Sequence, residues 1–394
     1  MRACYWLTAA TLFLVSPSSA AWDEYDYSNG YIPSTSKNST YDEAVLMPLK
    51  FTEWYDRFAP TLNEVSTTVC NLSLRAYRGD MEARLTLGPV NGYCWVHTNC
   101  ILETIPERVK ASFSGTSILL GLAPTTLSVL GPSAAEIALL SLHRPFICLL
   151  LSLGAPAIYP GRFLMWDNPI RAHAPQTGAF VILPVPKPWA IFTSLLQYTV
   201  VAGAGANTMQ AAYRIGVQSV SSWSCETSYW PMVWILLALV IHFTASMSLR
   251  ASIKRKNFYI TTPAGDLEGA ATTENKESWK QSGFIPRLID EVTISANQKW
   301  RLSDKYDVRI GPLAVSLQHV GAFLSVAHLV FGTLLFSSLL FISVGEAMIL
   351  ILRFIVSATV CRVILQFEVG GITKVDSSRV YNGIVQSPEG QKDE

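Results

Sequence analysis

The chain has 394 residues, of which 50% are hydrophobic and only 15% are charged. Soluble globular proteins usually carry about a quarter charged residues, so this composition indicates a chain whose main partner is the lipid bilayer. With 30 basic against 29 acidic residues the formal net charge is +1. The sequence therefore lacks the basic excess that attracts nucleic acid, and it excludes a nucleic-acid-binding function.

The first twenty residues predict a secretory signal peptide. Arg2 supplies the charged start, and an apolar run covers residues 4–15. Small residues at Ser18 and Ala20 then precede the expected cleavage site. An uncleaved signal anchor is the alternative. Both interpretations place residue 21 onward in the lumen of the secretory pathway or outside the cell.

Residues 21–110 are predicted to form a small lumenal or extracellular region. It carries two N-glycosylation sequons, at Asn38 and Asn71. The region contains three cysteines, and a fourth lies in a later polar loop. In such an oxidising compartment cysteines tend to form disulfide bonds. The disulfide candidates are Cys70, Cys94, Cys100 and Cys225. Four cysteines allow three pairings, which the sequence does not separate.

Six apolar segments follow this region. They cover residues 111–131, 145–160, 188–206, 230–249, 321–343 and 347–367. The strongest of them, 230–249, is long enough to cross a ~30 Å hydrocarbon layer. A basic run that starts at Arg250 follows it directly. Such a run favours the cytoplasmic side of the membrane.

The basic run limits the number of preceding crossings. Three crossings from a lumenal residue 21 put Arg250 in the cytosol, whereas four put it outside. We therefore expect residues 111–160, which are broken by Pro124, Pro132, Pro145 and Pro156, to cross once in total, as one span plus a re-entrant or interfacial piece. His143 and Arg144 are expected at a membrane interface. Six ordinary spans are the alternative.

The predicted fold class is all-α: a polytopic helical membrane bundle of five or six spans with a small disulfide-bearing N-terminal ectodomain. The last two segments are expected to form a hairpin that turns at Gly345 and Glu346. The chain then divides into a signal peptide (1–20), a lumenal region (21–110), a first membrane bundle (111–249), a cytosolic loop (250–311), a membrane hairpin (312–367) and a cytosolic tail (368–394).

A polar stripe continues the third apolar segment. At helical spacings of three and four, one face carries Asn207, Gln210, Arg214 and Gln218. Together with Arg353 of the last hairpin, this stripe is a candidate polar path for a substrate. The alternative is an interfacial helix end whose Arg214 reaches the headgroups. Glu346 lies seven residues before Arg353, so the two either pair inside the bundle or Glu346 lies in water at the turn.

The sequence offers no catalytic, cofactor-binding or metal-ligating residues, and no cofactor is predicted. It contains no nucleotide-binding, serine-hydrolase or zinc-protease motif. Among its six histidines, His242 and His328 are the only pair with a conceivable role as haem ligands across the bundle. A hydrogen bond between packed helices is the favoured interpretation of these two residues.

Two short blocks, Gly131-Pro132-Ser133 and Arg144-Pro145, stand within a longer region of likeness over residues 94–249. There the chain resembles a family of multi-span membrane proteins of filamentous fungi, in which His143 stands where a second arginine is common. No activity is established for that family, so the resemblance implies no catalytic residue. Some of its members are encoded beside specialised-metabolite genes, which implies an accessory role.

Three functions are compatible with the sequence. The favoured one is a non-catalytic membrane accessory or scaffold that binds protein partners, in the plasma membrane or an endomembrane. The alternatives are a small-molecule transporter and a membrane enzyme acting on a lipophilic substrate. Both alternatives predict that four residues meet at one cavity: Arg214, His242, His328 and Arg353.

Overall fold

The computed structural model describes residues 50–90, 92–159, 187–255, 291–295, 306–308 and 311–372. All of them belong to one compact unit, Leu49–Glu394. The expected signal peptide, the sequon at Asn38 and most of the expected cytosolic loop and tail lie outside the described residues.

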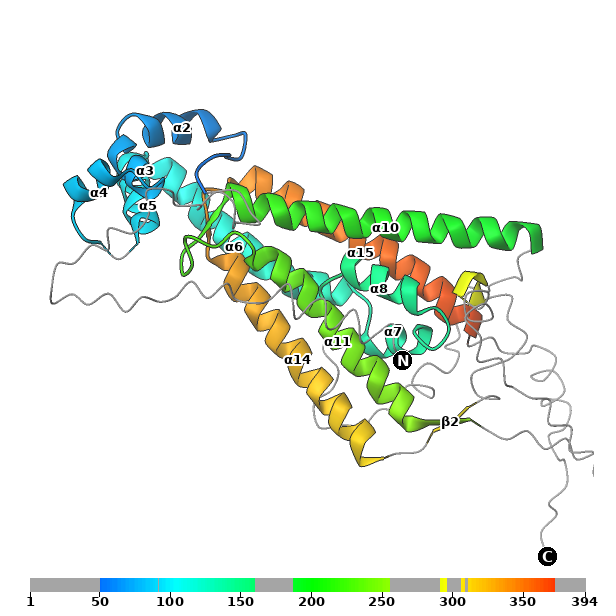
Figure 1. Ribbon diagram of the computed structural model, residues 1–394. Helices are drawn as coiled ribbons and strands as arrows, with labels where there is room; N and C mark the ends of the chain where they lie inside the picture. The colour runs from blue at the N-terminus through cyan, green and yellow to red at the C-terminus, as the bar shows by residue number, and fades with distance from the viewer. Residues whose placement is uncertain are drawn as a thin grey trace, which may run out of the picture. The chain divides into compact units, whose positions relative to one another are not determined.

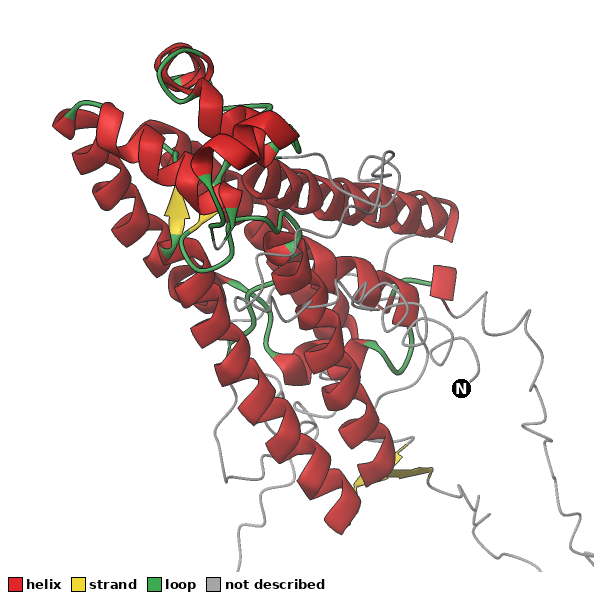
Figure 2. Ribbon diagram, turned by 60° about the vertical axis from the view of Figure 1, so that its left-hand side comes forward, coloured by secondary structure: helices red, strands yellow, loops and turns green. Residues whose placement is uncertain are grey.

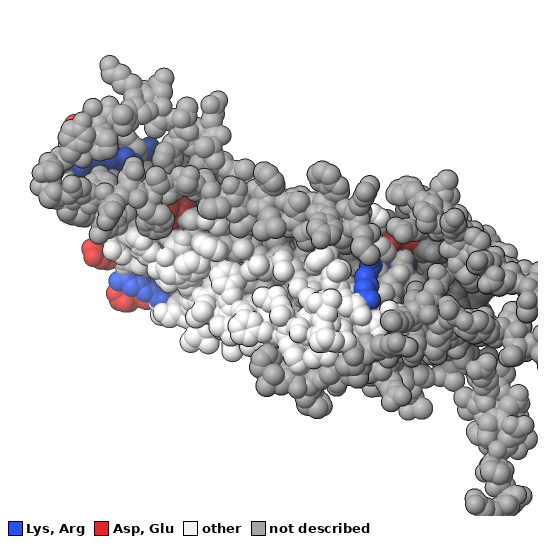
Figure 3. All heavy atoms as spheres, turned by 60° about the horizontal axis from the view of Figure 1, so that its bottom comes forward, with Lys and Arg blue, Asp and Glu red and all other residues white. Residues whose placement is uncertain are grey.

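Five long helices form the bundle: α6 (Glu107–Leu130), α10 (Lys187–Gln218), α11 (Trp230–Ser252), α14 (Pro312–Ser337) and α15 (Val344–Ile372) (Figure 1). Each is long and apolar enough to cross a membrane. The predicted all-helical fold class is confirmed (Figure 2). On the face shown in Figure 3, uncharged side chains form a broad band between charged groups at its two ends, as expected of a surface in contact with lipid.

The described part of the stretch between α6 and α10, residues 131–159, contains two short helices: α7 (Ala134–Leu140) and α8 (Pro145–Gly154). The Ser133 side chain and Glu136 form a capping box that starts α7, and Pro145 stands at the start of α8. With ten residues, α8 is about 15 Å long, half of the hydrocarbon thickness. This short helix is consistent with the expected re-entrant or interfacial piece.

Close approach of small residues positions α8 against the bundle. A Cβ added at Gly154 would lie 2.5 Å from the Cys361 sulfur of α15 and 3.2 Å from the Ala204 Cβ of α10. Gly205 of α10 packs against the same turn of α8. The small-residue run of α10 therefore serves helix contact on its buried side.

The expected turn of the last hairpin is wrong by several residues. Gly345 and Glu346 lie in the first turn of α15, and the connection runs through β4 (Leu339–Leu340) to Ser343. Glu346 accepts hydrogen bonds from the Ser343 backbone N–H (3.1 Å) and hydroxyl (2.9 Å), which caps the helix. The helix also continues to Ile372, into the expected tail.

Between residue 50 and α6 the described residues form four short helices: α2 (Ala59–Thr67), α3 (Asn71–Tyr77), α4 (Met81–Leu87) and α5 (Tyr93–Thr104). We call them the helical domain. Disulfides Cys70–Cys100 and Cys94–Cys225 cross it. The second disulfide bonds α5 to the loop between α10 and α11, so the domain is covalently fixed to the bundle.

A buried lysine strengthens the same junction. Lys50 donates its ammonium protons to the carbonyl oxygens of Gly216 and Ser219 at the C-terminal end of α10, where the helix dipole favours a cation. Burial lowers the pKa of Lys50 to about 7. Beside it, β1 (Val220–Ser221) pairs with β4 in an antiparallel ladder. At the other end of α11, β2 (Ile253–Arg255) pairs with β3 (Tyr306–Val308).

His97 makes the helical domain sensitive to acid. Its ring is fully buried, and both nitrogens lie 2.9 Å from a hydroxyl, of Ser66 on one side and of Ser73 on the other. Burial, with a smaller effect of Arg78, lowers the pKa of His97 to about 4. Because the folded pKa lies below the ordinary value near 6.5, stability is full above pH 6.5 and is lost as the pH falls toward 4.

We expect this loss to reach about 3 kcal/mol of unfolding free energy at pH 4. The measurement is the thermal stability of the protein between pH 7 and pH 4. His97→Gln, which does not titrate there, should show a shallower pH dependence than the unmodified protein. Parallel curves for the two proteins would contradict the role of His97.

Candidate functional site

Arg144 is a fully buried charge of the bundle. Its side chain is 0% exposed and forms an ion pair of 2.8 Å with Glu368 of α15, which is also 0% exposed. The guanidinium donates further hydrogen bonds to the Gln197 side chain (2.7 Å), the Ser194 hydroxyl (2.7 Å) and the Glu291 carbonyl (2.9 Å). Arg144 is therefore buried inside the protein, where distant partners neutralise its charge, and its expected depth at a membrane interface stays a prediction.

The acidic residues of this network hold segment 291–295 against the bundle. Glu368 accepts hydrogen bonds from the Ser295 backbone N–H (3.1 Å) and hydroxyl (2.7 Å). The Glu291 carboxylate accepts from the backbone N–H groups of Phe146 (3.0 Å) and Ile147 (3.3 Å) at the start of α8. Both carboxylates thus hold together chain segments that are far apart in the sequence.

A second arginine of α15 is also paired. Arg362 forms an ion pair with Glu136, the residue that caps α7. The side chains are 30% and 12% exposed. This pair fastens α7 to α15.

Arg353, the other arginine of α15, has only neutral partners among the described residues. Its Nε donates to Asn207 Oδ1 (2.8 Å), and its Nη2 donates to Gln210 Oε1 (2.7 Å) and to the Asn207 carbonyl (3.2 Å). Asn207 in turn donates to the Ser357 hydroxyl (2.8 Å). No described carboxylate lies in ion-pair distance of Arg353, so the expected pair with Glu346 does not form.

A groove between α10 and α15 begins at Arg353. Its volume is about 440 Å³. The floor and walls are mostly apolar or small, and the polar groups lie at one end. The lining residues are Val200, Gly203, Ala204, Asn207, Leu352, Arg353, Val356, Ser357 and Val360.

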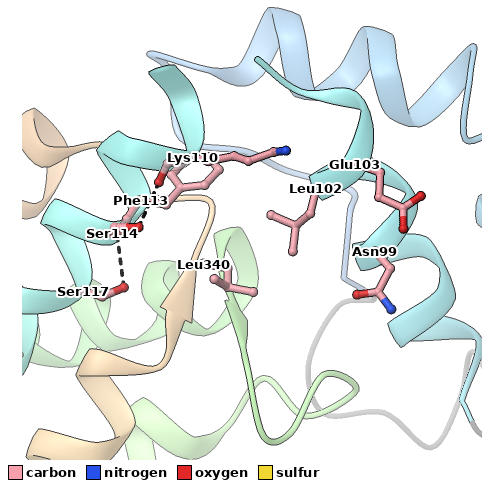
Figure 4. Close-up of a pocket in the computed structure, with 8 residues that line it drawn as sticks. All are labelled: Asn99, Leu102, Glu103, Lys110, Phe113, Ser114, Ser117 and Leu340. Atoms are coloured by element: carbon pink, nitrogen blue, oxygen red, sulfur yellow. Dashed lines mark hydrogen bonds between the residues drawn. The ribbon is translucent and has the colours of Figure 1, made fainter. Parts of the chain in front are cut away.

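A second hollow of about 390 Å³ lies where the helical domain meets α6 (Figure 4). We call it the junction hollow. Apolar side chains of Leu102, Phe113 and Leu340 line it beside the more polar Asn99, Glu103, Lys110, Ser114 and Ser117. The figure shows that these side chains come from α5, α6 and β4, three separate parts of the chain. Phe113 is buried, whereas Asn99 and Ser114 are exposed.

The predicted polar path is divided in the structure. Asn207, Gln210 and Arg353 meet, whereas Gln218 points to Glu53 of the segment before α2, at 3.5 Å. Arg214 is half-buried and lines neither the groove nor the junction hollow. The helical spacing placed these residues on one face of α10, but α15 borders only part of that face.

The two histidines lie between α11 and α14. His328 donates from Nε2 to the Trp234 carbonyl at 2.8 Å, and its ring stacks on Trp234 with 5.1 Å between centroids. Neither ring nitrogen of His242 has a partner among the described residues. His242 and His328 line neither the groove nor the junction hollow.

These features define a multi-span helical membrane protein with a helical domain disulfide-bonded to its bundle. In comparisons with protein-family models, curated proteins and solved structures, no match to this chain is found. The resemblance to a fungal membrane-protein family stays a prediction.

Proposed function

We propose that the protein is a non-catalytic membrane scaffold that holds a protein partner at the junction hollow. The observation that carries this proposal is the rigid attachment of the domain that forms one wall of the hollow. The Cys94–Cys225 disulfide and the buried Lys50 fix α5 relative to α10, and β1 pairs with β4 beside them. A preformed, rigid surface binds a partner with less loss of conformational entropy.

The chemistry of the hollow supports a protein ligand. Protein interfaces combine an apolar centre with a polar rim, which is the arrangement of Leu102 and Phe113 beside Asn99, Glu103 and Lys110. Lys110 already pairs with Glu107 at 2.7 Å. The rim is therefore suited to hydrogen bonding more than to binding a strongly charged small molecule.

The charges of the bundle also support a scaffold. Arg144 and Arg362 are paired with Glu368 and Glu136, and each pair joins segments that are far apart in the sequence. Intramembrane charges used in this way fasten the bundle together. A transporter or an enzyme that uses Arg214, His242, His328 and Arg353 together requires a shared cavity, and those residues are dispersed over different contacts. By resemblance, the process served by the scaffold is fungal specialised-metabolite biosynthesis.

The test places a photo-reactive residue at Ser114, which is exposed and lines the hollow, and irradiates intact cells. We expect one cross-linked protein of defined mass. Asn99→Trp, which fills the hollow from an exposed position, should reduce that adduct at least about tenfold, as loss of an interface hot spot does. A photo-reactive residue at Arg108, which is exposed on α6 outside the hollow, is the matched control.

Metabolite profiles then separate the scaffold from the alternatives. If the protein is a scaffold, Asn99→Trp should change the profile of the cells as much as deletion of the gene does. If deletion of the gene changes the profile but cells with the Asn99→Trp variant keep the profile of the unmodified protein, a transporter or an enzyme is favoured. That result would contradict the proposal. Equal adducts at Ser114 and Arg108 would contradict it as well.

A further inference from the structure

We propose that the groove between α10 and α15 binds a single-chain lipophilic carboxylate, with the acid on Arg353 and the chain along the groove. This site is separate from the junction hollow and does not depend on the scaffold proposal. Three observations carry it: a cation without a carboxylate partner among the described residues, an open apolar groove that begins at that cation, and the depth of the cation in the membrane.

The charge of Arg353 identifies an anionic ligand. The bundle arginines Arg144 and Arg362 each have a carboxylate partner, whereas the described partners of Arg353 are side-chain amide and backbone carbonyl groups. Its Nη1 donates to no described residue. A cation inside a membrane-spanning segment is costly without a counter-charge. A carboxylate supplies that charge and matches the planar guanidinium.

The groove identifies the rest of the ligand. Helices α10 and α15 run antiparallel, since Asn207 contacts Arg353 while Gln197 contacts Glu368. On α10 the lining runs from Asn207 back to Val200, a span of seven residues that corresponds to roughly 10 Å of groove. Its volume of about 440 Å³ lies within the range of small-molecule sites.

The floor of the groove is open at a glycine. A Cβ added at Gly203 would meet no atom within 4 Å, so a larger side chain there would occupy the groove without a clash. Val200, Val356 and Val360 line the same stretch. A single hydrocarbon chain fits this lining, and it would bury apolar surface of both helices.

The position of Arg353 argues against an anionic phospholipid. The membrane-spanning part of α15 has 27 residues, about 40 Å against a hydrocarbon layer of ~30 Å. Arg353 lies nine residues after Val344, about 14 Å from that end, and its side chain leans toward the same end. This end carries the helical domain, because the Arg57 backbone N–H bonds to Glu346.

Disulfides mark the helical domain as lumenal or extracellular. Anionic phospholipids are concentrated in the opposite, cytoplasmic leaflet. A single-chain acid can reach Arg353 from the lumenal leaflet, and its carboxylate would lie about 9 Å below the headgroup boundary, since the helix exceeds the hydrocarbon layer by about 5 Å at each end.

The experiment uses the full-length protein in nanodiscs of phosphatidylcholine and a sixteen-carbon fatty acid with a photo-reactive group in its chain. We expect labelling of α10 and α15 peptides. Unlabelled palmitic acid should compete at least about tenfold better than its methyl ester, because only the acid forms a charge-assisted bond. Equal competition by acid and ester on the unmodified protein would overturn the proposal.

Two variants, each compared with a matched control variant, complete the test. Arg353→Gln should abolish the preference for acid over ester, whereas Arg353→Lys should keep a preference. Gly203→Leu should reduce labelling at least about tenfold, and Ala202→Leu, at an exposed neighbouring position outside the groove lining, should not. Equal labelling of the two leucine variants would overturn the location.

Two other occupants are outcomes of the same experiment. Displacement of the probe by phosphatidylglycerol as effectively as by palmitic acid would assign the groove to a phospholipid and overturn the proposal. Dimer formation that buries Gly203 and excludes the probe would assign it to a second copy of the chain, with the same consequence.

Discussion

Arg144→Met is expected to lower the melting temperature of the detergent-solubilised protein by roughly 4–6 °C. The substitution leaves Glu368 fully buried without its cation, and breaking a buried ion pair in this way costs about 3–5 kcal/mol. It also removes the donors that hold Gln197, Ser194 and the Glu291 carbonyl. Unfolding can be followed by a thiol-reactive dye, because Cys148 and Cys361 are free and buried.

Two controls separate loss of charge balance from loss of volume. In Arg144→Met with Glu368→Gln, the unpaired charge is removed and the amide oxygen can still accept from either Gln197 or Ser295, so this double variant should melt closer to the unmodified protein than the single variant does. Arg75→Met breaks an exposed pair, 48% and 32% exposed, and should leave the melting temperature nearly unchanged. Equal melting of the single and double variants would show that the charge of Glu368 is not the cause.

Removal of the Cys94–Cys225 disulfide, with both residues replaced by Ala, is expected to cost about 5 kcal/mol of unfolding free energy. The bond closes a loop with a sequence separation of 131 residues, and the loop-closure entropy of the unfolded chain rises with that length. The Cys70–Cys100 bond, with a separation of 30, should cost about 3.5 kcal/mol when removed in the same way.

Hydrogen exchange measured by mass spectrometry distinguishes the two disulfides. Without Cys94–Cys225, the backbone amides of α5 and of the loop around Cys225 should both exchange at least about a hundredfold faster, because the bond holds these two segments together. Without Cys70–Cys100, the increase should be confined to α3 and α5. Faster exchange in α5 alone after loss of Cys94–Cys225 would show that other contacts fix the loop.

The span-forming segments could be predicted because hydropathy is a local property. Five of the six apolar segments contribute to the five long helices, and the sixth, around α8, is too short to cross. The disulfide-forming cysteines could also be predicted, from the oxidising compartment that the sequence indicates for them. Their pairing could not, because it depends on which helices meet.

The Arg144 network shows what a sequence pattern omits. Glu368 falls one residue past the last apolar segment, which predicts a place in the tail, and Glu291 falls in the expected loop. Gln197 lies inside an apolar segment without any periodic signal of its own. Only the fold brings these three residues to one arginine. The polar-path prediction was only partly right for the same reason. Helical spacing shows which residues share a face of α10, but it does not show which other helix covers that face.

The Cys94–Cys225 bond also sets an order of events during synthesis. Its two sulfurs are separated by α6, α7, α8 and α10, so the bond cannot close until those helices have been made and inserted. At about 5–20 residues per second, the ribosome needs roughly 7–26 s to add the intervening 131 residues. Throughout that interval the Cys94 thiol must escape capture by Cys70 or Cys100, both of which have been made long before Cys225. Correct maturation of this membrane protein therefore depends on how quickly the Cys70–Cys100 bond forms.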